Sequence, residues 1–376
     1  MAKKISQLTV GQALSGSELF EMTQNLGSYS VSAGAIGNYC NSVINSDNKI
    51  INGNMDIWQR GTSSVSAPDY GADRWYCTEG GTWNYDIYQS LEVPTVDDGC
   101  SSTCNYSLLA RVTTANASPA AGDYAVILQR IEGCYIHDLL GQNCVLSFWV
   151  KCDKTGTFCV SFRNDDSDRS MSMEYTINSS DVWEYKEISF YLDDTGTWST
   201  DEGVIGMSVF FSMGVGTNFV NPSGAGVWAD GNYFGGTSNQ TNAMDTVGSD
   251  FRITKVQLQR GKKATPFHSD IALELKRCQR YYQVSPAPQH TLMAVIGIAS
   301  GNVNYYGEQF NHKMCKVPSV SITGVSETGS GFNGVATGDI TVAIITAYGF
   351  RWNVTASTTA AGSSSIGISY TATAEL

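Results

Sequence analysis

The sequence predicts a mainly β protein, and three features of the chain support that prediction. Charged residues make up only 15% of the 376 residues, well below the roughly 25% that is usual for globular proteins. The 38 glycines provide many positions for tight turns. Several segments alternate between apolar and polar residues with the period of two that marks a half-buried strand. A chain of this length exceeds one ordinary core, so we expect more than one domain.

Residues 1–47 form the first expected unit, a small N-terminal anchor. Residues 18–23 and 28–31 flank Gly27 and predict a hairpin, with a short helix after it. A unit this small cannot close a core by itself, so we expect a partner or copies of the chain to order it. The alternative is an arm that packs on its own body. The apolar residues expected to make the anchoring contacts are Ile5, Leu8, Leu14, Leu19 and Phe20.

Residues 48–268 form the second expected unit, a β-sandwich. Alternation predicts a buried face in each of three strands, made of Leu146, Phe148, Val150 and Cys152, of Ile188, Phe190 and Leu192, and of Met207, Val209, Phe211 and Met213. Turn residues at 153–156 predict a hairpin between Cys152 and Cys159. This spacing of strands and turns favours two packed antiparallel sheets, and a jelly roll is the expected arrangement.

Residues 269–283 are expected to form a short connecting helix. Ser269 or Asp270 can cap its N-terminus. Its apolar residues form a narrow stripe, Ile271, Leu275, Cys278 and Tyr282, which must pack against another surface. That surface is either the sandwich of the same chain or the same helix in two neighbouring subunits.

Residues 284–376 form the last expected unit, a C-terminal β domain. Residues 340–348 and 365–372 are rich in β-branched side chains and nearly uncharged, as strands often are. Exposed singly, such strands would promote aggregation. We therefore expect them to be buried in a sandwich or between subunits.

One long stretch of the chain resembles a module common in bacteriophage virion proteins. Residues 52–62 (Asn-Gly-Asn-Met-Asp-Ile-Trp-Gln-Arg-Gly-Thr) and 71–76 (Gly-Ala-Asp-Arg-Trp-Tyr) look like its opening strand. The other matching segments are 129–132 and 146–151 at the places of inner strands, 253–261, 264–267 and 278–282 as closing strand and exit helix, and 370–376 as a last strand. The resemblance covers most of the chain and implies a carbohydrate-binding-like jelly roll.

The start of the chain resembles the short N-terminal modules of phage fibre proteins, through Lys-Ile-Ser-Gln-Leu at 4–8 and Leu-Ser-Gly-Ser-Glu-Leu at 14–19. These resemblances imply a structural tail fibre or head fibre of the virion, assembled in the host cytoplasm. They imply a homotrimer whose N-terminus attaches to capsid, portal or tail proteins. The body of such a fibre would contact host-surface polysaccharide.

Charge and hydropathy exclude several other partners. The net charge of -12 opposes binding to nucleic acid. No apolar run reaches the ~18 residues of a membrane span, and no apolar stretch follows Lys4 as it would in a signal peptide. We expect no membrane insertion and folding in a cytosol. The ten cysteines are then expected to be free thiols rather than a disulfide framework.

No cofactor or metal site is predicted. The letters G-x-G-x-x-G at 329–334 belong to no βαβ unit, and G-x-S-x-G and H-E-x-x-H are absent. Asn164, Asp166 and Asp168 alternate like the start of a calcium loop, but Arg169 and Tyr175 stand where an EF-hand has Gly and Glu. A looser calcium site is the alternative.

Acidic clusters are the candidates for catalysis: Asp97 with Asp98, Asp165 with Asp166 and Asp168, Asp193 with Asp194, and Asp201 with Glu202. Each sits among Gly, Ser and Thr, where a solvated turn is the ordinary explanation. No β-helix repeat like those of many tailspike depolymerases is visible. We expect a protein that is not an enzyme. The alternatives are a polysaccharide-degrading tailspike-type enzyme, and a head fibre or capsid decoration without a ligand.

The candidate glycan-binding residues are Trp228, Tyr233 and Phe234, in the Gly- and Asn-rich stretch 218–242. Sugars stack their apolar C–H faces on aromatic rings, while their hydroxyls bond to polar side chains. The alternative is that these rings belong to the core. Trp149 alternates outward from an apolar strand face and Trp183 precedes a strand, so neither is assigned to a ligand.

Overall fold

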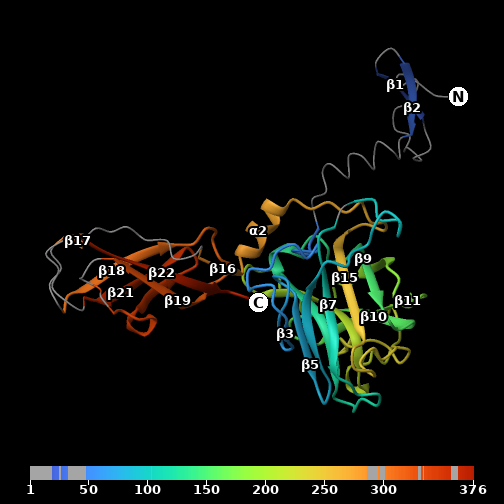
Figure 1. Cartoon of the computed structure of the whole chain (residues 1–376). Coiled ribbons are helices and arrows are strands. Elements are labelled where there is room, and N and C mark those ends of the chain that lie inside the picture. Colours follow the sequence, from blue (N-terminus) through green and yellow to red (C-terminus); the bar gives the residue numbers. More distant parts are fainter. Residues whose placement is uncertain are drawn as a thin grey trace.

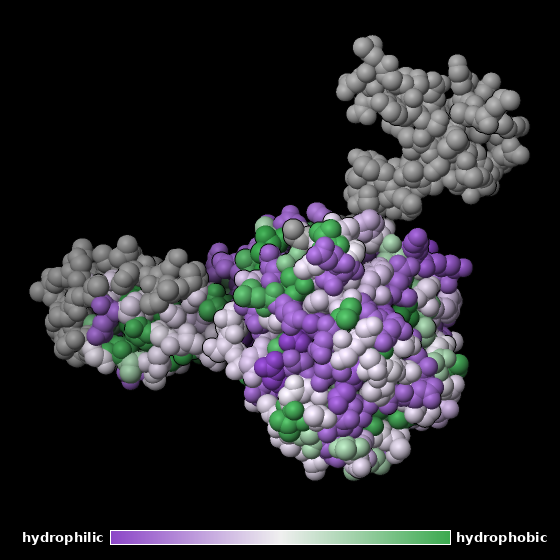
Figure 2. Space-filling view, turned by 45° about the vertical axis from the view of Figure 1, so that its right-hand side comes forward, coloured by the Kyte–Doolittle hydropathy of each residue, from purple (hydrophilic) through white to green (hydrophobic). Residues whose placement is uncertain are grey.

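The computed structural model describes residues 48–102, 104–285, 301–328, 332, 334–356 and 363–376, together with the backbone of 19–24, 27–32 and 295–296. The protein is mainly β, as predicted. A large β-sandwich and a smaller group of C-terminal strands meet near α2 (Ile271–Gln279) (Figure 1). On the face of the sandwich seen in Figure 2, polar side chains dominate and apolar side chains occur in small groups.

The sandwich consists of a seven-stranded and a six-stranded sheet, both antiparallel. The first has the order β14-β11-β10-β13-β8-β5-β4, with β4 (Asp69–Tyr70), β5 (Tyr76–Gly80), β8 (Tyr124–Glu132), β10 (Gly156–Asn164), β11 (Arg169–Ile177), β13 (Ile205–Val215) and β14 (Ala229–Asp230). The second has the order β12-β9-β15-β7-β6-β3, with β3 (Val65–Ser66), β6 (Asn84–Ser90), β7 (Ser107–Thr114), β9 (Gln142–Cys152), β12 (Glu184–Leu192) and β15 (Asp250–Arg260). The chain crosses repeatedly between the sheets, as in the predicted jelly roll.

One continuous core fills the space between the two sheets and confirms the predicted alternation. The predicted inward residues of β9, β12 and β13 are all at most 6% exposed and belong to this core. Phe148 meets Phe211 edge to face, with ring centroids 5.0 Å apart. Phe162 stacks on Phe190 at 4.1 Å. Each of these strands fills the core from one face, because side chains on a strand alternate between the two sides of its sheet.

The predicted hairpin at 153–156 is wrong. β9 belongs to the six-stranded sheet and β10 to the seven-stranded sheet, so these residues carry the chain from one sheet to the other. Cys152 and Cys159 therefore lie on strands of different sheets. Turn residues mark a reversal of the chain but do not determine which sheet receives the next strand. The nine cysteines in the described part of the chain form no disulfide with one another.

The stretch 52–76 builds a junction between the sandwich and the elements that follow it. The side chain of Asn52, 1% exposed, donates to the carbonyls of Ile57 and Asp73 and accepts from the Ile57 amide. The Asn52 amide donates to the Glu274 carboxylate of α2 at 2.5 Å. One buried asparagine thus connects its own turn, the turn before β5 and the helix.

Two arginines of the same stretch bind the end of the chain. Glu375 accepts from Arg60 at 2.9 Å and forms an ion pair with Arg74, which is 2% exposed. The Arg74 guanidinium lies over the Tyr281 ring, 3.5 Å from its centroid. The Tyr281 hydroxyl donates to the buried Glu132 carboxylate at 2.6 Å. Charge-assisted hydrogen bonds of this kind are the stronger ones in proteins, so the last residues are firmly attached to the sandwich.

The helix α2 is shorter than predicted. Asp270 caps it as expected, because its carboxylate accepts from the two amides of the first turn at 2.9 and 3.2 Å. The helix ends at Gln279, since Tyr282 begins a strand that pairs with the end of the chain. Cys278 is buried and Leu275 packs against the C-terminal core. The stripe therefore contacts its own chain at these two positions.

The C-terminal strands surround a second core. One sheet contains β16 (Tyr282–Val284), β17 (Val295–Ile296), β19 (Ser319–Thr328) and β22 (Ser363–Thr373), and the other has the order β18-β21-β20, with β18 (Val303–Gln309), β20 (Thr341–Thr346) and β21 (Gly349–Thr355). Tyr306 stacks on Trp352 in this core at 4.4 Å. Ile51 and Ile57 belong to the same apolar cluster, so it extends into the junction.

The N-terminal strands β1 (Leu19–Gln24) and β2 (Gly27–Ser32) pair in antiparallel register, which confirms the predicted hairpin. The expected anchor residues Ile5, Leu8 and Leu14 lie outside the described residues, and Leu19 and Phe20 are placed on β1 by their backbone. Anchoring by these residues stays a prediction. No helix of the described residues is both long and apolar enough to cross a membrane.

Candidate binding cleft

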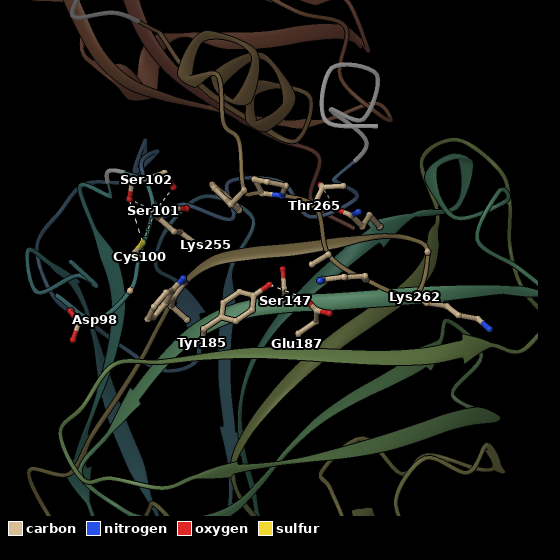
Figure 3. A pocket seen from close by; sticks show the side chains of 18 of the residues that line it. Asp98, Cys100, Ser101, Ser102, Ser147, Tyr185, Glu187, Lys255, Lys262 and Thr265 are labelled. Carbon is tan, nitrogen blue, oxygen red and sulfur yellow. Dashed lines mark hydrogen bonds between the residues drawn. The ribbon is translucent and has the colours of Figure 1, made fainter. Parts of the chain in front are cut away.

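A cleft of about 1000 Å³ lies on the outer face of the six-stranded sheet (Figure 3). Its floor consists of outward-facing residues of β9, β12 and β15, and its walls are the segments 98–102 and 260–267. Clefts of roughly 300–1000 Å³ are the usual size for small-molecule ligands. The sheet therefore offers a concave surface large enough for a short oligomer of a polar ligand.

Two aromatic rings form a platform on the floor of the cleft. Trp149 of β9 and Tyr185 of β12 are direct cross-strand partners, with ring centroids 5.7 Å apart. Trp149 is 7% exposed and packs against Cys100 and Trp183. Tyr185 is 47% exposed and presents most of the accessible ring surface. The buried ring supports the exposed one, so the platform is fixed before any ligand arrives.

A second cross-strand pair, Ser147 and Glu187, lies beside this platform. The Tyr185 hydroxyl donates to the Glu187 carboxylate at 3.2 Å. Partial burial raises the pKa of Tyr185, against a hydrogen bond with Ser147 that lowers it. The phenol is therefore a neutral group at physiological pH. Together the pair and the phenol offer hydrogen-bonding groups next to an apolar ring.

Lys255 reaches the cleft because β15 contains a β-bulge. Where β15 pairs with β9, Thr254 lies opposite Trp149 and Gln257 lies opposite Ser147. The chain thus advances three residues along β15 but only two along β9. The extra residue places Thr254 and Lys255 successively on the outer side of the sheet. Lys255 has a φ of 51°, in the left-handed region.

The Lys255 side chain attaches one wall of the cleft to the sheet. Its ammonium is buried and donates to the Ser102 carbonyl at 2.5 Å, the Ser102 hydroxyl at 2.7 Å and the Cys100 sulfur at 3.0 Å. A buried ammonium needs such partners to offset its lost hydration. The bulge also requires a glycine nearby, because a Cβ at Gly53 would lie 2.0 Å from the Val256 carbonyl oxygen.

The opposite wall, 260–267, is attached through the glutamines of β15. The Thr265 hydroxyl donates to the Gln259 side chain at 2.9 Å, and the Gln257 side chain donates to the Thr265 carbonyl at 2.9 Å. Gly261 has a φ of +133° and donates its amide to the Asn143 carbonyl at 2.8 Å. These bonds hold the wall in one position above the floor.

Three cations that form no ion pair with the described residues stand on this wall, Arg260, Lys262 and Lys263. Arg260 donates to the Gln142 side chain at 2.7 Å, at the end of β9. Lys262 and Lys263 are exposed, and within the described part of the chain neither forms an ion pair. Figure 3 places Lys262 and Asp98 on opposite sides of the cleft. The cleft thus has a basic side.

This arrangement fits a ligand that has both an apolar face and many hydroxyls. The exposed Tyr185 ring can stack on the C–H face of a sugar, while the exposed Glu187 carboxylate can accept from its hydroxyls. Among the described residues, no three metal-ligating side chains converge on one point. The cleft thus places an aromatic face next to hydrogen-bonding groups.

The predicted residues Trp228 and Tyr233 do not line this cleft. The Trp228 indole donates to the Tyr191 carbonyl of β12 at 2.8 Å and meets Trp198 edge to face at 5.6 Å. Because β12 and β14 are the edge strands of the two sheets, Trp228 bridges the open edge of the sandwich. Tyr233 is partly exposed. Glycan binding by Trp228 and Tyr233 stays a prediction.

The expectation for Phe234 is corrected by its burial. Phe234 is 5% exposed and lies in a cluster of aromatic rings. Its centroid is 4.7 Å from Phe219, 5.0 Å from Phe210 and 5.4 Å from Tyr124. A ring enclosed in this way has no free face for a sugar. Glycine-rich surroundings suggested a surface loop, but they do not tell on which side of the loop a ring packs.

Two of the acidic clusters take part in ion pairs. Asp193 pairs with Arg169, which also pairs with Asp230 at 2.7 Å. Although burial opposes it, hydrogen bonds from Thr195 and Arg169 lower the pKa of Asp193. A general acid for glycoside cleavage needs a raised pKa, so Asp193 is poorly suited to that role. Glu202 of the last cluster pairs with Arg280.

The cleft residues Trp149, Tyr185 and Lys255 were not predicted as a site. Trp149 and Tyr185 are outward-facing aromatic residues on strands whose other faces are apolar, and that combination was a usable signal. For Lys255 the signal is the spacing of apolar residues in β15, at 253, 256 and then 258, which indicates a bulge. That the three share one cleft depends on strands far apart in sequence.

Several solved structures are similar to parts of this chain. The enzymatically active domain of tailspike protein 4 of bacteriophage CBA120 matches 57% of this chain at 16% identity, with a TM-score of 0.32. The match spans only 21% of that tailspike chain. The module TmCBM61, solved with β-1,4-galactotriose, matches 57% of this chain and 99% of its own length at 11% identity, with a TM-score of 0.27.

A family 11 carbohydrate-binding module of a Clostridium thermocellum cellulase matches 54% of this chain and 98% of its own length. Its identity is 12% and its TM-score 0.28. No protein-family model matches the sequence, and no curated protein matches it. The fold described above rests on the strand pairings and core of this chain itself.

Proposed function

We propose that this protein is a fibre-type structural protein of a phage virion that binds host-surface saccharide in the cleft of its sandwich. The binding part of the proposal is supported by one observation: the exposed Tyr185 ring, supported by the buried Trp149 ring, lies among polar side chains in a preformed cleft. Aromatic platforms of this kind bind sugars by stacking, and the preformed walls reduce the entropy lost on binding.

The virion part of the proposal is supported by the sequence resemblance at 4–8, 14–19 and 52–76. Within it, the N-terminal segment attaches the fibre to capsid, portal or tail proteins, and the sandwich faces outward. Copies in a homotrimer would engage several saccharide chains together, so weak single sites would still hold the particle at a surface.

The proposed activity is binding without cleavage. Glycoside hydrolysis needs two carboxyl groups about 5–9.5 Å apart across one bond. The cleft has the carboxylates of Asp98 and Glu187, and Figure 3 places Asp98 at the far side from Glu187. Asp98 accepts from the amide and hydroxyl of Thr95 at 2.8 and 2.9 Å, as in an ordinary turn. Incubation with a bound polysaccharide should release no new reducing ends.

Binding is tested by comparing two tyrosines of one strand. Tyr185→Ala removes the exposed platform ring, whereas Tyr191→Ala removes a ring of similar exposure, 51%, outside the cleft. By calorimetry on a host-surface polysaccharide found by array screening, Tyr185→Ala should weaken binding by ~1–3 kcal/mol. Tyr191→Ala should bind as the parent does. If both variants bind equally, or the parent binds no saccharide, the proposed function is wrong and a decoration without ligand replaces it.

A further inference from the structure

We infer that the saccharide taken by this cleft is anionic, and that Lys262 and Lys263 bind its acidic groups. This inference rests on the proposed function and names the ligand class of that same site. The cleft and the rest of the protein differ in their balance of charge. The whole chain has 23 Lys and Arg residues against 35 Asp and Glu residues. The cleft has the opposite balance.

Four cationic side chains line the cleft, Lys255, Arg260, Lys262 and Lys263, against the two carboxylates of Asp98 and Glu187. The surrounding acidic protein repels anions at long range, but that repulsion is screened beyond a Debye length of about 8–10 Å at physiological salt. Inside the cleft the nearest charges decide the interaction. A local excess of cations on an acidic protein therefore indicates a specific anionic ligand rather than general attraction to polyanions.

Not all four cations are available to a ligand. The Lys255 ammonium is buried and bonded to Ser102 and Cys100, whereas Arg260 is exposed and donates to the neutral Gln142 side chain. Lys262 and Lys263 remain exposed, with no ion pair among the residues that the structure describes. Their ammonium groups are therefore available to bind the acidic groups of a ligand.

The position of the two lysines suits a ligand that also stacks on the platform. They belong to the wall 260–267, which is held to the floor by the bonds between Thr265, Gln257 and Gln259. The wall is thus ordered before binding. Figure 3 places Lys262 on the side of the cleft opposite Asp98. A sugar lying over Tyr185 would direct its acidic substituents toward the lysines and away from Asp98.

The test uses acidic polysaccharides and uncharged copies of the same polymers. Oligosaccharides of alginate, polygalacturonate and hyaluronan are presented on an array beside their carboxyl-reduced forms, with neutral galactan and xylan oligosaccharides. The full-length parent should bind at least one acidic oligosaccharide ten-fold or more tightly than its carboxyl-reduced form. Raising the salt from 50 to 500 mM should weaken that binding.

Two double variants distinguish the effect of the lysines in the cleft from the effect of the net charge of the protein. Lys262→Ala with Lys263→Ala should lower affinity for the acidic ligand ten-fold or more and flatten its dependence on salt. Lys276→Ala with Lys316→Ala removes two exposed lysines outside the cleft and changes the net charge equally, so affinity should stay within about two-fold of the parent. Melting temperature is measured for both to confirm folding.

The outcomes distinguish the two proposals. If acidic and carboxyl-reduced forms bind equally, and Tyr185→Ala still abolishes binding, the cleft binds saccharide but the anionic assignment is wrong. The assignment is also wrong if both double variants lose affinity to the same extent. If no oligosaccharide, charged or neutral, binds the parent, the proposed function fails together with this inference.

Discussion

Asp73 shows how burial changes the chemistry of a single residue. It is 1% exposed, and its carboxylate accepts hydrogen bonds from the amide and side chain of Gln59. Burial raises its pKa from 3.8 to about 6, although Gln59 and the nearby Arg60 both lower it. The shift means that the folded protein binds a proton at Asp73 more tightly than the unfolded chain does.

The raised pKa makes the free energy of unfolding depend on pH. Asp73 favours folding most below pH 4, and this contribution is lost as the pH rises from about 4 through 6. The lost free energy is on the order of 3 kcal/mol, from about 1.4 kcal/mol per pKa unit. Asp73→Asn cannot titrate, so its unfolding free energy relative to the parent should rise by that amount between pH 4 and 7, measured by urea denaturation. A difference between Asp73→Asn and the parent that does not change with pH would contradict the assignment.

The strand β15 determines the candidate cleft at the scale of an element. Its inward residues Ile253, Val256 and Leu258 fill the core, while its outward glutamines hold one wall of the cleft. Its bulge supplies Lys255, which holds the other wall. One strand therefore connects the core to both walls, and a change in its register would displace the whole site.

Lys255→Met tests this role because methionine has a similar length but no ammonium group. Without that donor, the segment 98–102 should detach more often, and Cys100, 3% exposed in the parent, should react faster with iodoacetamide. Mass spectrometry of native protein should detect at least a three-fold faster modification of Cys100. Cys144, fully buried in the same sandwich, is the internal control. Equal acceleration at Cys144 would indicate general unfolding instead of local release.

At the scale of the whole molecule, one junction unites the sandwich, the helix and the C-terminal strands. Arg280 after the helix pairs with Glu132 of β8 at 2.8 Å and with Glu202 at 2.7 Å. Burial opposes ionisation of Glu132, but hydrogen bonds from Arg280 and Tyr281 lower its pKa overall. The network remains charged at neutral pH, and the residues named in it all lie after residue 47. We therefore expect the described fold to form without the N-terminal segment.

Deletion of residues 1–47 should separate folding from attachment. The truncated protein should keep the thermal transition of the parent, because the sandwich core and the junction are intact. It should no longer co-purify with virions, which quantitative gel analysis of purified particles would measure. Recovery on particles at the copy number of the parent would show that the anchor lies elsewhere. A lost thermal transition would show that the arm packs on its own body.

Local sequence patterns were sufficient to predict the buried faces of several strands and the start of the helix. Alternation at a period of two was sufficient to identify the buried faces of β9, β12 and β13, because side chains on a strand must alternate between the two sides of the sheet. The neighbouring capping candidates Ser269 and Asp270 placed the start of α2 to within one residue, since capping involves only nearby amides. Both features depend on residues close together in sequence.

The tertiary structure decided the rest. Which sheet receives β10 after the turn at 153–156, and whether Phe234 faces solvent or Phe210, depend on partners far away in sequence. The cleft brings together segments near 100, 149, 185 and 260, and no local pattern specifies that combination. The sequence alone thus determined the fold class and strand faces, because these follow from backbone geometry. The site was decided by packing between distant strands, because only packing sets which outward faces meet.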